Sequence, residues 1–424
     1  MSSDQAPSSD PAPTFKTTVV SHYFPPEIGA PQARLGEMTR FWAEAGDEVT
    51  VLTGMPNHPT GIVPDEYKGR IRVDESSEGY RIVRTWLYAT PNNGFVKKIV
   101  GHLSFMATSA ALGVGKVGRP DVVVVSSPTF FSIFSAWFLA RVKRSALIVE
   151  VRDLWPAIFV ELGVLTNPVV IRLLERLELA AYHAADHVVV VSEGFRDDLI
   201  QRGVPTEKVS TITNGADLDR FPSAPVDAAD RAWLGADDDD VVVLYIGAHG
   251  ISHGLDAVAE ACARLDGDKV HVAFVGEGAA KPQLVDKVRE LGVDHISLHD
   301  GVPSERVPAL LAAADICLVP LRDVSLFSSF IPSKIFEYLA AGKAVVGSVE
   351  GEPANILREA GALVVPPEDV DALAEAIGEL VDDQNRRVSM AAEGRVAVAA
   401  RFDRRVLAER YREVIAKVVA QRNG

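Results

Sequence analysis

The side chains with the clearest chemical potential in this sequence are Ser333, Lys334 and Glu337, which lie within the first turns of a predicted helix. Pro332 is tolerated in a first helical turn, and Gly342 can end the helix in a left-handed conformation. A helix N-terminus offers free N–H groups and a positive dipole end, so with an added lysine it can bind phosphate. The alternative is an ordinary surface ion pair on a scaffold helix.

Small and basic residues follow other strands in the same half of the chain. Gly247 and His253 lie in the turn after one predicted strand, Gly276 and Glu277 follow the next, and Arg322 comes shortly before the segment described above. Glycines at such turns permit a close approach of the backbone to a ligand. Because the turns fall at the same edge of one sheet, we expect them to form a rim that binds phosphate.

Two strand ends in the first half of the chain also carry polar groups. A Pro-rich loop with Glu27 and Gly29 leads into a helix with Arg34, and a later apolar strand ends at Arg152 and Asp153. Charges at the end of an apolar strand cost free energy unless they are paired or functional. An open sheet binds ligands at this edge, although an ordinary loop and a mutual ion pair remain alternatives. The three spaced glycines of the dinucleotide fingerprint are absent, which argues against a nicotinamide enzyme.

The composition indicates a large globular protein. At 424 residues with 47% hydrophobic content, the chain is predicted to form two domains. A net charge of −15 argues against a general nucleic-acid-binding protein. Cys262 and Cys317 lack metal-ligand spacing and are expected to be reduced core residues of a cytoplasmic protein. No segment has the roughly 18 uninterrupted apolar residues that a membrane-spanning helix needs.

Short Val- and Ile-rich runs alternate with helical patterns, which predicts an α/β fold with parallel sheets covered on both faces. The predicted strands are 17–21, 49–53, 81–84, 122–125, 146–151, 187–191, 209–212, 241–246, 270–275, 295–298, 316–319, 344–346 and 363–365. We expect a disordered tail over 1–15, a Rossmann-like domain over 16–221, a linker over 222–240, a second such domain over 241–400, and a C-terminal helix over 401–424 that crosses back to the first domain. Two doubly wound halves facing each other would hold a ligand between them.

Metal chemistry has little support in the sequence. Asp217 and Asp219 form one isolated pair near the domain boundary, and the aspartates at 237–240 are a linker charge run. Capping or solvated carboxylates account for both, so no metal is expected.

The order of these motifs resembles the retaining glycosyltransferases of family 4, which have the GT-B fold of two Rossmann-like domains facing each other across a cleft. The resemblance covers residues 17–415 and is closest to transferases that build bacterial surface polysaccharides such as colanic acid and O antigen. The segments that carry it are 25–29 with Arg34, 45–52, 152–156, 192–195, 214–217, 276–278, 314–320 and 332–342.

The resemblance implies a nucleotide-diphosphate-sugar donor, which we interpret as a UDP-sugar, held mainly by the second domain. Glu337 matches a glutamate that holds the ribose hydroxyls, and Lys334 with Ser333 would face the diphosphate. Val302 follows the turn that usually meets the base, while Gly276 and Glu277 would lie beside the nucleotide.

The sequence departs from the family pattern at the donor site. Ser329 replaces the first glutamate of a pair, so that residue's contact with the donor sugar stays open. Ala248 and His253 replace a family Arg and Lys. Positive charge is then expected from Lys334, from Arg322 and from His253 when protonated.

On the acceptor side, the resemblance makes Glu27, Gly29, Arg34, Arg152 and Asp153 the candidate binding residues, with Asp153 orienting the acceptor. The implied reaction is sugar transfer to an acceptor hydroxyl with retention at the anomeric carbon. Lys334 and Arg322 would stabilise the charge of the leaving diphosphate. No cofactor is expected beyond the nucleotide sugar.

The segment 95–106 joins apolar residues to Lys97 and Lys98. It could lie at the inner face of the plasma membrane and meet a lipid-linked acceptor, or it could be an ordinary buried helix. Two other functions share the two-domain plan: a nucleotide-sugar 2-epimerase, and a non-catalytic protein that binds nucleotide sugars.

Overall fold

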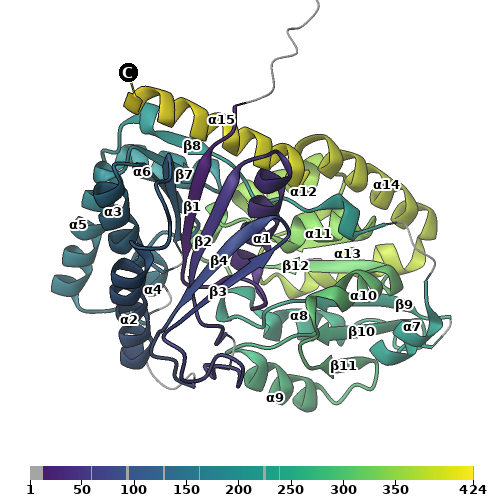
Figure 1. Ribbon diagram of the computed structural model, residues 1–424. Helices are drawn as coiled ribbons and strands as arrows, with labels where there is room; N and C mark the ends of the chain where they lie inside the picture. The colour runs from purple at the N-terminus through teal and green to yellow at the C-terminus, as the bar shows by residue number, and fades with distance from the viewer. Residues whose placement is uncertain are drawn as a thin grey trace, which may run out of the picture.

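The structure is a computed structural model that describes residues 13–58, 60–91, 95–127, 129–161, 163–222, 226–237 and 239–423. Most of the tail predicted to be disordered, and positions 223–225 and 238 of the predicted linker, lie outside these residues. Two α/β units follow each other along the described chain (Figure 1).

The first sheet has the strand order β3-β4-β2-β1-β5-β6-β7-β8. Its strands are β1 (Lys16–Ser21), β2 (Glu48–Gly54), β3 (Arg72–Ser77), β4 (Tyr80–Thr85), β5 (Val122–Ser127), β6 (Ala146–Val151), β7 (His187–Val190) and β8 (Val209–Thr211). Neighbouring strands are parallel except for the β3–β4 hairpin. The hairpin strand β3 was not predicted, because its sequence RVDESS is polar and it lies at the exposed edge.

The second sheet has the order β11-β10-β9-β12-β13-β14, and all its pairs are parallel. Its strands are β9 (Val241–Ile246), β10 (Val270–Val275), β11 (Ile296–His299), β12 (Ile316–Pro320), β13 (Ala344–Ser348) and β14 (Leu363–Val365). In chain order this is 3-2-1-4-5-6, so the order reverses between β9 and β12. Ligands bind outside the carboxyl ends of strands at such a point.

Helices cover both faces of each sheet. They are α1 (Ala30–Glu44), α2 (Phe95–Gly113), α3 (Ser132–Lys143), α4 (Ala157–Glu161), α5 (Pro168–Ala184), α6 (Glu193–Gln201), α7 (Ala228–Leu234), α8 (Leu255–Cys262), α9 (Lys281–Leu291), α10 (Val307–Ala313), α11 (Lys334–Ala340), α12 (Gly351–Glu359), α13 (Val370–Asp382), α14 (Gln384–Arg401) and α15 (Arg404–Asn423). Short 3₁₀ helices include η2 (Leu218–Arg220), η3 (Ile251–His253) and η5 (Ser325–Ser329). The central strands are buried on both faces, which is why they are nearly continuous apolar runs.

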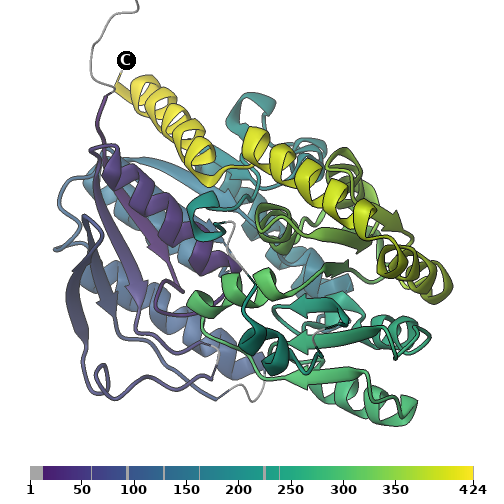
Figure 2. The ribbon, with the colours of Figure 1, turned by 90° about the vertical axis from the view of Figure 1, so that its right-hand side faces the viewer.

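The last helix, α15, packs on the first sheet's side rather than on the second. Figure 2 shows it lying along α1. The indole of Trp42 donates to the Ala408 carbonyl at 3.1 Å, and the Tyr411 ring meets it edge-on with centroids 5.1 Å apart. Arg412 pairs with the buried carboxylate of Asp47 at 2.9 Å. The chain therefore passes between the two units twice, before β9 and again before α15.

Candidate functional site

Lys334 is the first residue of α11, and its ammonium group is buried. Its Nζ lies 3.6 Å from the centroid of the Tyr245 ring and has no hydrogen-bond partner among the described residues. Burial lowers the pKa of Lys334 to about 7, and the nearby carboxylate of Glu337 opposes this shift. A buried ammonium without an acceptor costs free energy. The position is therefore suited to an anionic ligand that would supply the missing acceptor.

Two glycines leave open the space beside Lys334. A Cβ on Gly247 would lie 3.3 Å from the Lys334 Nζ, and one on Gly276 would overlap the Gly247 carbonyl. Both glycines have positive φ values, 141° and 154°, which other residues rarely adopt. The ends of β9 and β10 thus meet the N-terminus of α11, so the structure brings Gly247, Gly276 and Lys334 together.

Glu277 lies beside the turn that precedes Val302. Its Oε1 accepts hydrogen bonds from the Lys281 ammonium at 2.8 Å and from the Gly301 N–H at 3.3 Å. Val302 packs against the apolar core of the second unit. Both residues are therefore at the same edge as Gly276, although the Glu277 carboxylate already carries a cationic partner.

Glu337 is half-buried, and its backbone is bonded within the helix, but its carboxylate has no hydrogen bond or ion pair with the residues that the structure describes. Burial raises its pKa, and the charges of Arg220 and Arg404 oppose this shift while Glu37 reinforces it. Ser333 is the N-cap residue of α11, but its hydroxyl makes no capping hydrogen bond. The first turn of α11 therefore presents a carboxylate and a hydroxyl that are both available to a ligand.

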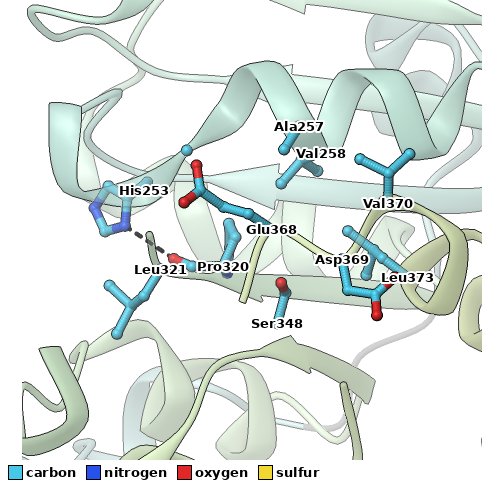
Figure 3. Close-up of a pocket in the computed structure, with 11 residues that line it drawn as sticks. His253, Ala257, Val258, Pro320, Leu321, Ser348, Glu368, Asp369, Val370 and Leu373 are labelled. Atoms are coloured by element: carbon cyan, nitrogen blue, oxygen red, sulfur yellow. Dashed lines mark hydrogen bonds between the residues drawn. The ribbon is translucent and has the colours of Figure 1, made fainter. Parts of the chain in front are cut away.

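His253 and Arg322 differ from the roles expected of them. Burial and the charge of Lys334 lower the pKa of His253 to about 3, so its ring is neutral and adds no positive charge. Figure 3 shows its hydrogen bond to the Pro320 carbonyl, at 3.2 Å. Arg322 donates to the Ile251 carbonyl at 2.8 Å and pairs with two carboxylates, Asp256 and Glu368. The structure therefore leaves Lys334 as the available cation of the three.

Ser329, the last residue of η5, lies against the first unit. A Cβ on Gly194 would overlap the Ser329 Oγ, so the two residues are in direct contact across the units. The expectation of a donor-sugar contact from Ser329 does not fit this arrangement, because its side chain faces α6.

Arg34, a candidate acceptor-binding residue, is buried and bonds to residues of the first domain. It is 0% exposed and pairs with Glu150 of β6 at 3.1 Å. It also donates to the carbonyls of Ile212 at 2.9 Å and Thr213 at 2.6 Å, and to the Asn214 side chain. Its guanidinium is already bonded within the domain, so this arrangement gives no support to the predicted acceptor contact, which stays a prediction.

Glu27, predicted to bind the acceptor, forms hydrogen bonds within its own loop region. Its carboxylate accepts hydrogen bonds from the backbone N–H groups of Phe24 at 3.0 Å and of Asn57 and His58 at 2.8 Å each. The residue is buried, and burial raises its pKa although these three N–H groups oppose the shift. Gly29 is the N-cap residue of α1 and stays partly exposed.

Arg152 and Asp153 follow β6 at the carboxyl edge of the first sheet. Arg152 is buried, donates to the Ala30 carbonyl at 3.4 Å, and has its pKa lowered by burial to about 10. Asp153 is half-buried, and burial raises its pKa while Arg152 opposes the shift. The structure therefore brings Arg152 and Asp153 next to the start of α1, near Gly29.

Comparison with known proteins identifies the family. The family model described as Glycosyl transferase 4-like domain matches residues 29–215, and that described as Glycosyl transferases group 1 matches residues 226–397. The chain belongs to the GT-B glycosyltransferases of family 4. This glycosyltransferase therefore has the two Rossmann-like domains that its motif order predicted, and the fold prediction is confirmed.

Relatives and solved structures agree with the assignment. The chain is 27% identical over 376 residues to the putative colanic acid biosynthesis glycosyl transferase WcaI of Escherichia coli K12, covering 86% of this chain and 91% of the relative. It is 26% identical over 414 residues to a GDP-mannose-dependent α-(1-6)-phosphatidylinositol monomannoside mannosyltransferase of Mycobacterium tuberculosis, with coverages of 91% and 94%. Anabaena Alr3699/HepE in complex with UDP and glucose superposes with a TM-score of 0.70 at 16% identity, covering 95% of this chain and 99% of that one.

Sequence reasoning missed His249 as a site residue of this glycosyltransferase. It is 0% exposed, and neither ring nitrogen has a hydrogen-bond partner among the described residues. Its ring and carbonyl fill the space beside Gly276 and Gly278. Burial, followed by the charges of Lys281 and Lys334, lowers its pKa to about 4. The glycine-rich turn that contains it was the available signal.

Buried charges also join the two domains near Glu337, and nothing in the sequence indicated them. Glu37 of α1 pairs with Arg220 of η2 at 3.1 Å and with Arg404 of α15 at 3.0 Å. Arg220 also donates to the Ser304 carbonyl of the second domain at 3.2 Å. These arginines come from the two places where the chain changes domain.

The described residues contain neither a candidate metal site nor a candidate membrane-spanning helix. Among the residues described, no three His, Cys, Asp or Glu side chains are grouped so that they could hold a metal ion. Asp217 caps η2 and pairs with Arg40. No described helix combines the length and apolar character needed to cross a bilayer.

Proposed function

We propose that this glycosyltransferase moves a sugar from a nucleoside diphosphate, a UDP-sugar in our interpretation, to an acceptor hydroxyl with retention at the anomeric carbon. The buried, unpartnered ammonium of Lys334 carries the proposal, because it lacks the anion that a diphosphate would provide. HepE, of the same fold, binds UDP, whereas the mycobacterial relative is named for GDP-mannose. The base is therefore the first property to measure.

The proposed chemistry depends on stabilising the leaving diphosphate. Cleavage of the sugar–phosphate bond leaves negative charge on the phosphate oxygens, and a positioned cation with N–H donors lowers the energy of that charge. Burial lowers the pKa of Lys334 to about 7, so binding of an anion would favour its protonated form. Glu337 would accept hydrogen bonds from the adjoining ribose.

Retention is proposed through attack from the face of the leaving group. A double displacement would need a carboxylate nucleophile facing an acid or base, and the residues assigned above provide no such pair. A phosphate oxygen of the departing diphosphate would then take the proton of the acceptor hydroxyl. Asp153, half-buried at the opposite sheet edge, would orient that hydroxyl. Cleft closure would exclude water and limit donor hydrolysis.

We also propose that the acceptor is a lipid-linked glycan of cell-surface polysaccharide synthesis, met at the inner face of the plasma membrane. The outer side of the first domain supports this. Lys97, Lys98 and Val100 are exposed on α2, so this helix is not simply buried. The helices α3 and α5 lie beside α2 (Figure 1). Large apolar side chains are also exposed on them: Trp137, Phe138 and Val142 on α3, and Val169, Val170, Leu173 and Leu177 on α5.

The charges beside this apolar face favour an anionic lipid surface over a second copy of the chain. Arg141, Arg172 and Arg176 are exposed among the apolar residues, in a protein of net charge −15. In a twofold dimer the same patch would face itself and bring these arginines together. A helix with apolar and basic residues exposed can lie in a membrane interface.

Vesicle flotation tests the membrane part. We expect binding to vesicles that contain anionic lipid, weak binding to zwitterionic vesicles, and loss of binding in Leu173→Ser/Leu177→Ser. The matched control is Val388→Ser/Val396→Ser, which changes two exposed valines of α14 in the other domain. Equal binding by both double variants would exclude this face, and a concentration-dependent dimer without vesicle binding would assign it to a second copy.

One assay tests the reaction. The purified protein is mixed with labelled nucleotide sugars and an extract of lipid-phosphate acceptors. We expect a glycosylated lipid whose anomeric configuration matches the donor, and no product from Lys334→Ala. A changed free donor would instead indicate a 2-epimerase, and donor binding without turnover would indicate a binding protein.

A further inference from the structure

Glu352 connects the two domains at a place where the chain does not cross between them. It lies in the first turn of α12 in the second domain. Its Oε1 accepts a hydrogen bond from the Glu193 N–H at 2.9 Å, and its Oε2 accepts one from the Gly194 N–H at 3.1 Å. Both donors belong to the first turn of α6 in the first domain. One carboxylate therefore binds two backbone groups of the other domain.

These two N–H groups have no acceptor within their own helix. The first four N–H groups of an α-helix lack intrahelical partners, and the dipole favours an anion there. Ser192, the N-cap residue, satisfies the Phe195 N–H at 3.2 Å. The carboxylate of Glu352 thus completes a cap that the first domain supplies only in part.

Two glycines, one in each domain, make room for the segment η5 between α6 and α12. Gly194 leaves room for the Ser329 side chain, and Gly351, with φ of 68°, leaves room for the carbonyl of Ser328. The segment η5 is therefore held between α6 and α12. Leu326 and Phe330, on and next to η5, pack against the apolar core of the first domain. The contact is specific in shape as well as in charge.

The contact leads directly into the donor side of the site. Only four residues separate Ser329 from Lys334, and Pro332 limits the freedom of the backbone between them. An opening of the domains that breaks the bonds of Glu352 must also release η5 from α6. The segment that precedes Lys334 is therefore coupled to closure.

We propose that Glu352 is a positioning residue that clasps the domains in the closed arrangement, and that breaking its two hydrogen bonds is a step of cleft opening. It touches neither proposed substrate. It acts through η5 on the start of α11. Its hydrogen bonds increase the fraction of molecules in which both halves of the site are assembled.

Hydrogen exchange at the Glu193 and Gly194 amides tests the clasp without substrate. We expect protection in the native protein, additional protection when UDP or GDP is bound, and loss of protection at these two amides in Glu352→Ala. Glu350→Ala is the matched control, because Glu350 is exposed at the N-cap of α12 and its side chain makes no capping bond. Fast exchange of both amides in the native protein would overturn the proposal.

Kinetics supply a second readout, and this part alone rests on the proposed transfer reaction. We expect Glu352→Ala to lower the transfer rate about tenfold, in line with losing two charge-assisted hydrogen bonds partly exposed to water, and to raise the share of donor lost to hydrolysis. Glu352→Gln, which keeps one accepting oxygen, should lie between. A transfer rate and hydrolysis share equal to those of the native enzyme would contradict the clasp.

A compensating pair keeps the test valid if Glu352→Ala folds poorly. Gly194→Ala should speed exchange at the Glu193 amide, because its Cβ would overlap the Ser329 side chain. Adding Ser329→Gly removes that overlap and should restore protection. If the double variant exchanges as fast as Gly194→Ala alone, closure does not depend on this contact.

Discussion

The Lys334 ammonium rests on the face of the Tyr245 ring, 3.6 Å from its centroid. The ring provides a cation–π contact but no acceptor for the three ammonium protons. The hydroxyl of Tyr245 is turned away and donates to the Ala248 carbonyl at 2.6 Å. Lys334 is therefore held in place by an aromatic surface while its hydrogen bonds remain to be made by a ligand.

Donor affinity should depend on pH through Lys334. Its pKa of about 7 means that Lys334 of the free enzyme carries its charge mainly below neutrality. We expect the dissociation constant of UDP or GDP to rise between pH 6 and pH 8.5, because the free enzyme loses the proton that an anion requires. Lys334→Arg should flatten this profile, since a guanidinium stays protonated. Calorimetric titration measures both, and the same slope in native and variant protein would assign the pH dependence to another group.

Burial of Lys334 should lower the free energy of unfolding near neutral pH. Its pKa is lower in the folded than in the unfolded chain, so the folded state binds fewer protons between about pH 7 and pH 10.5, and the free energy of unfolding should increase with pH over that range. We expect Lys334→Met to raise the thermal midpoint near pH 7, with a difference from native protein that shrinks toward pH 10. Scanning calorimetry measures the difference. A midpoint lowered at every pH would contradict this account.

Glu337 should increase the affinity for ligands that contain a ribose. Loss of hydrogen bonds to a charged group corresponds to roughly 10- to 100-fold in affinity, so Glu337→Ala should weaken UDP or GDP by that factor. Inorganic diphosphate, which has no ribose, should bind native and variant protein alike, whereas Lys334→Ala should weaken both ligands. Equal weakening of diphosphate and nucleotide by Glu337→Ala would mean that Glu337 acts on the phosphate region.

The buried pair of Arg34 and Glu150 should matter for folding rather than for acceptor affinity. Removing one partner leaves an uncompensated buried charge, which typically costs about 3–5 kcal/mol. We expect Arg34→Ala to lower the midpoint of urea unfolding strongly, and Arg34→Met/Glu150→Leu to recover part of the loss. Arg72→Ala, which removes an exposed partner of Asp74, serves as the control and should change stability little. A stable Arg34→Ala with a raised acceptor KM would restore the binding role.

Transfer should proceed without a divalent cation. Lys334 and the backbone N–H groups at the start of α11 are proposed to supply the positive potential that a metal supplies in other sites. We expect the rate to be unchanged in excess EDTA and on addition of Mg²⁺ or Mn²⁺. A rate abolished by EDTA and restored by one cation would show that the charge on the diphosphate needs a partner beyond Lys334.

The sheets, and the grouping of Gly247 and Gly276 with Lys334, could be predicted from the sequence because their signals are local. Strand β9 is an unbroken apolar run, and glycines at the ends of β9 and β10 mark the turns that approach α11. Strand β3 gave no such signal, because an exposed edge strand needs no apolar face.

The acceptor side could not be read in the same way because its charges find distant partners. Arg34 looked available at the edge of a sheet, but its partner Glu150 lies 116 positions away in the chain. Glu352 gave no signal, since its acceptor role depends on a helix start 158 and 159 residues earlier. A sequence shows where a charge is, but the fold decides whether that charge is already satisfied.

The return of α15 to α1 has a consequence for synthesis on the ribosome. Trp42 and Asp47 emerge early, but the Ala408 carbonyl and the Arg412 side chain that they contact follow 366 and 365 positions later. Until α15 has been made, the N-terminal half therefore holds an indole N–H without this acceptor and an Asp47 carboxylate whose remaining partner is the Phe15 N–H. Nascent chains stalled before residue 404 should be more sensitive to proteases and chaperones than full-length ones.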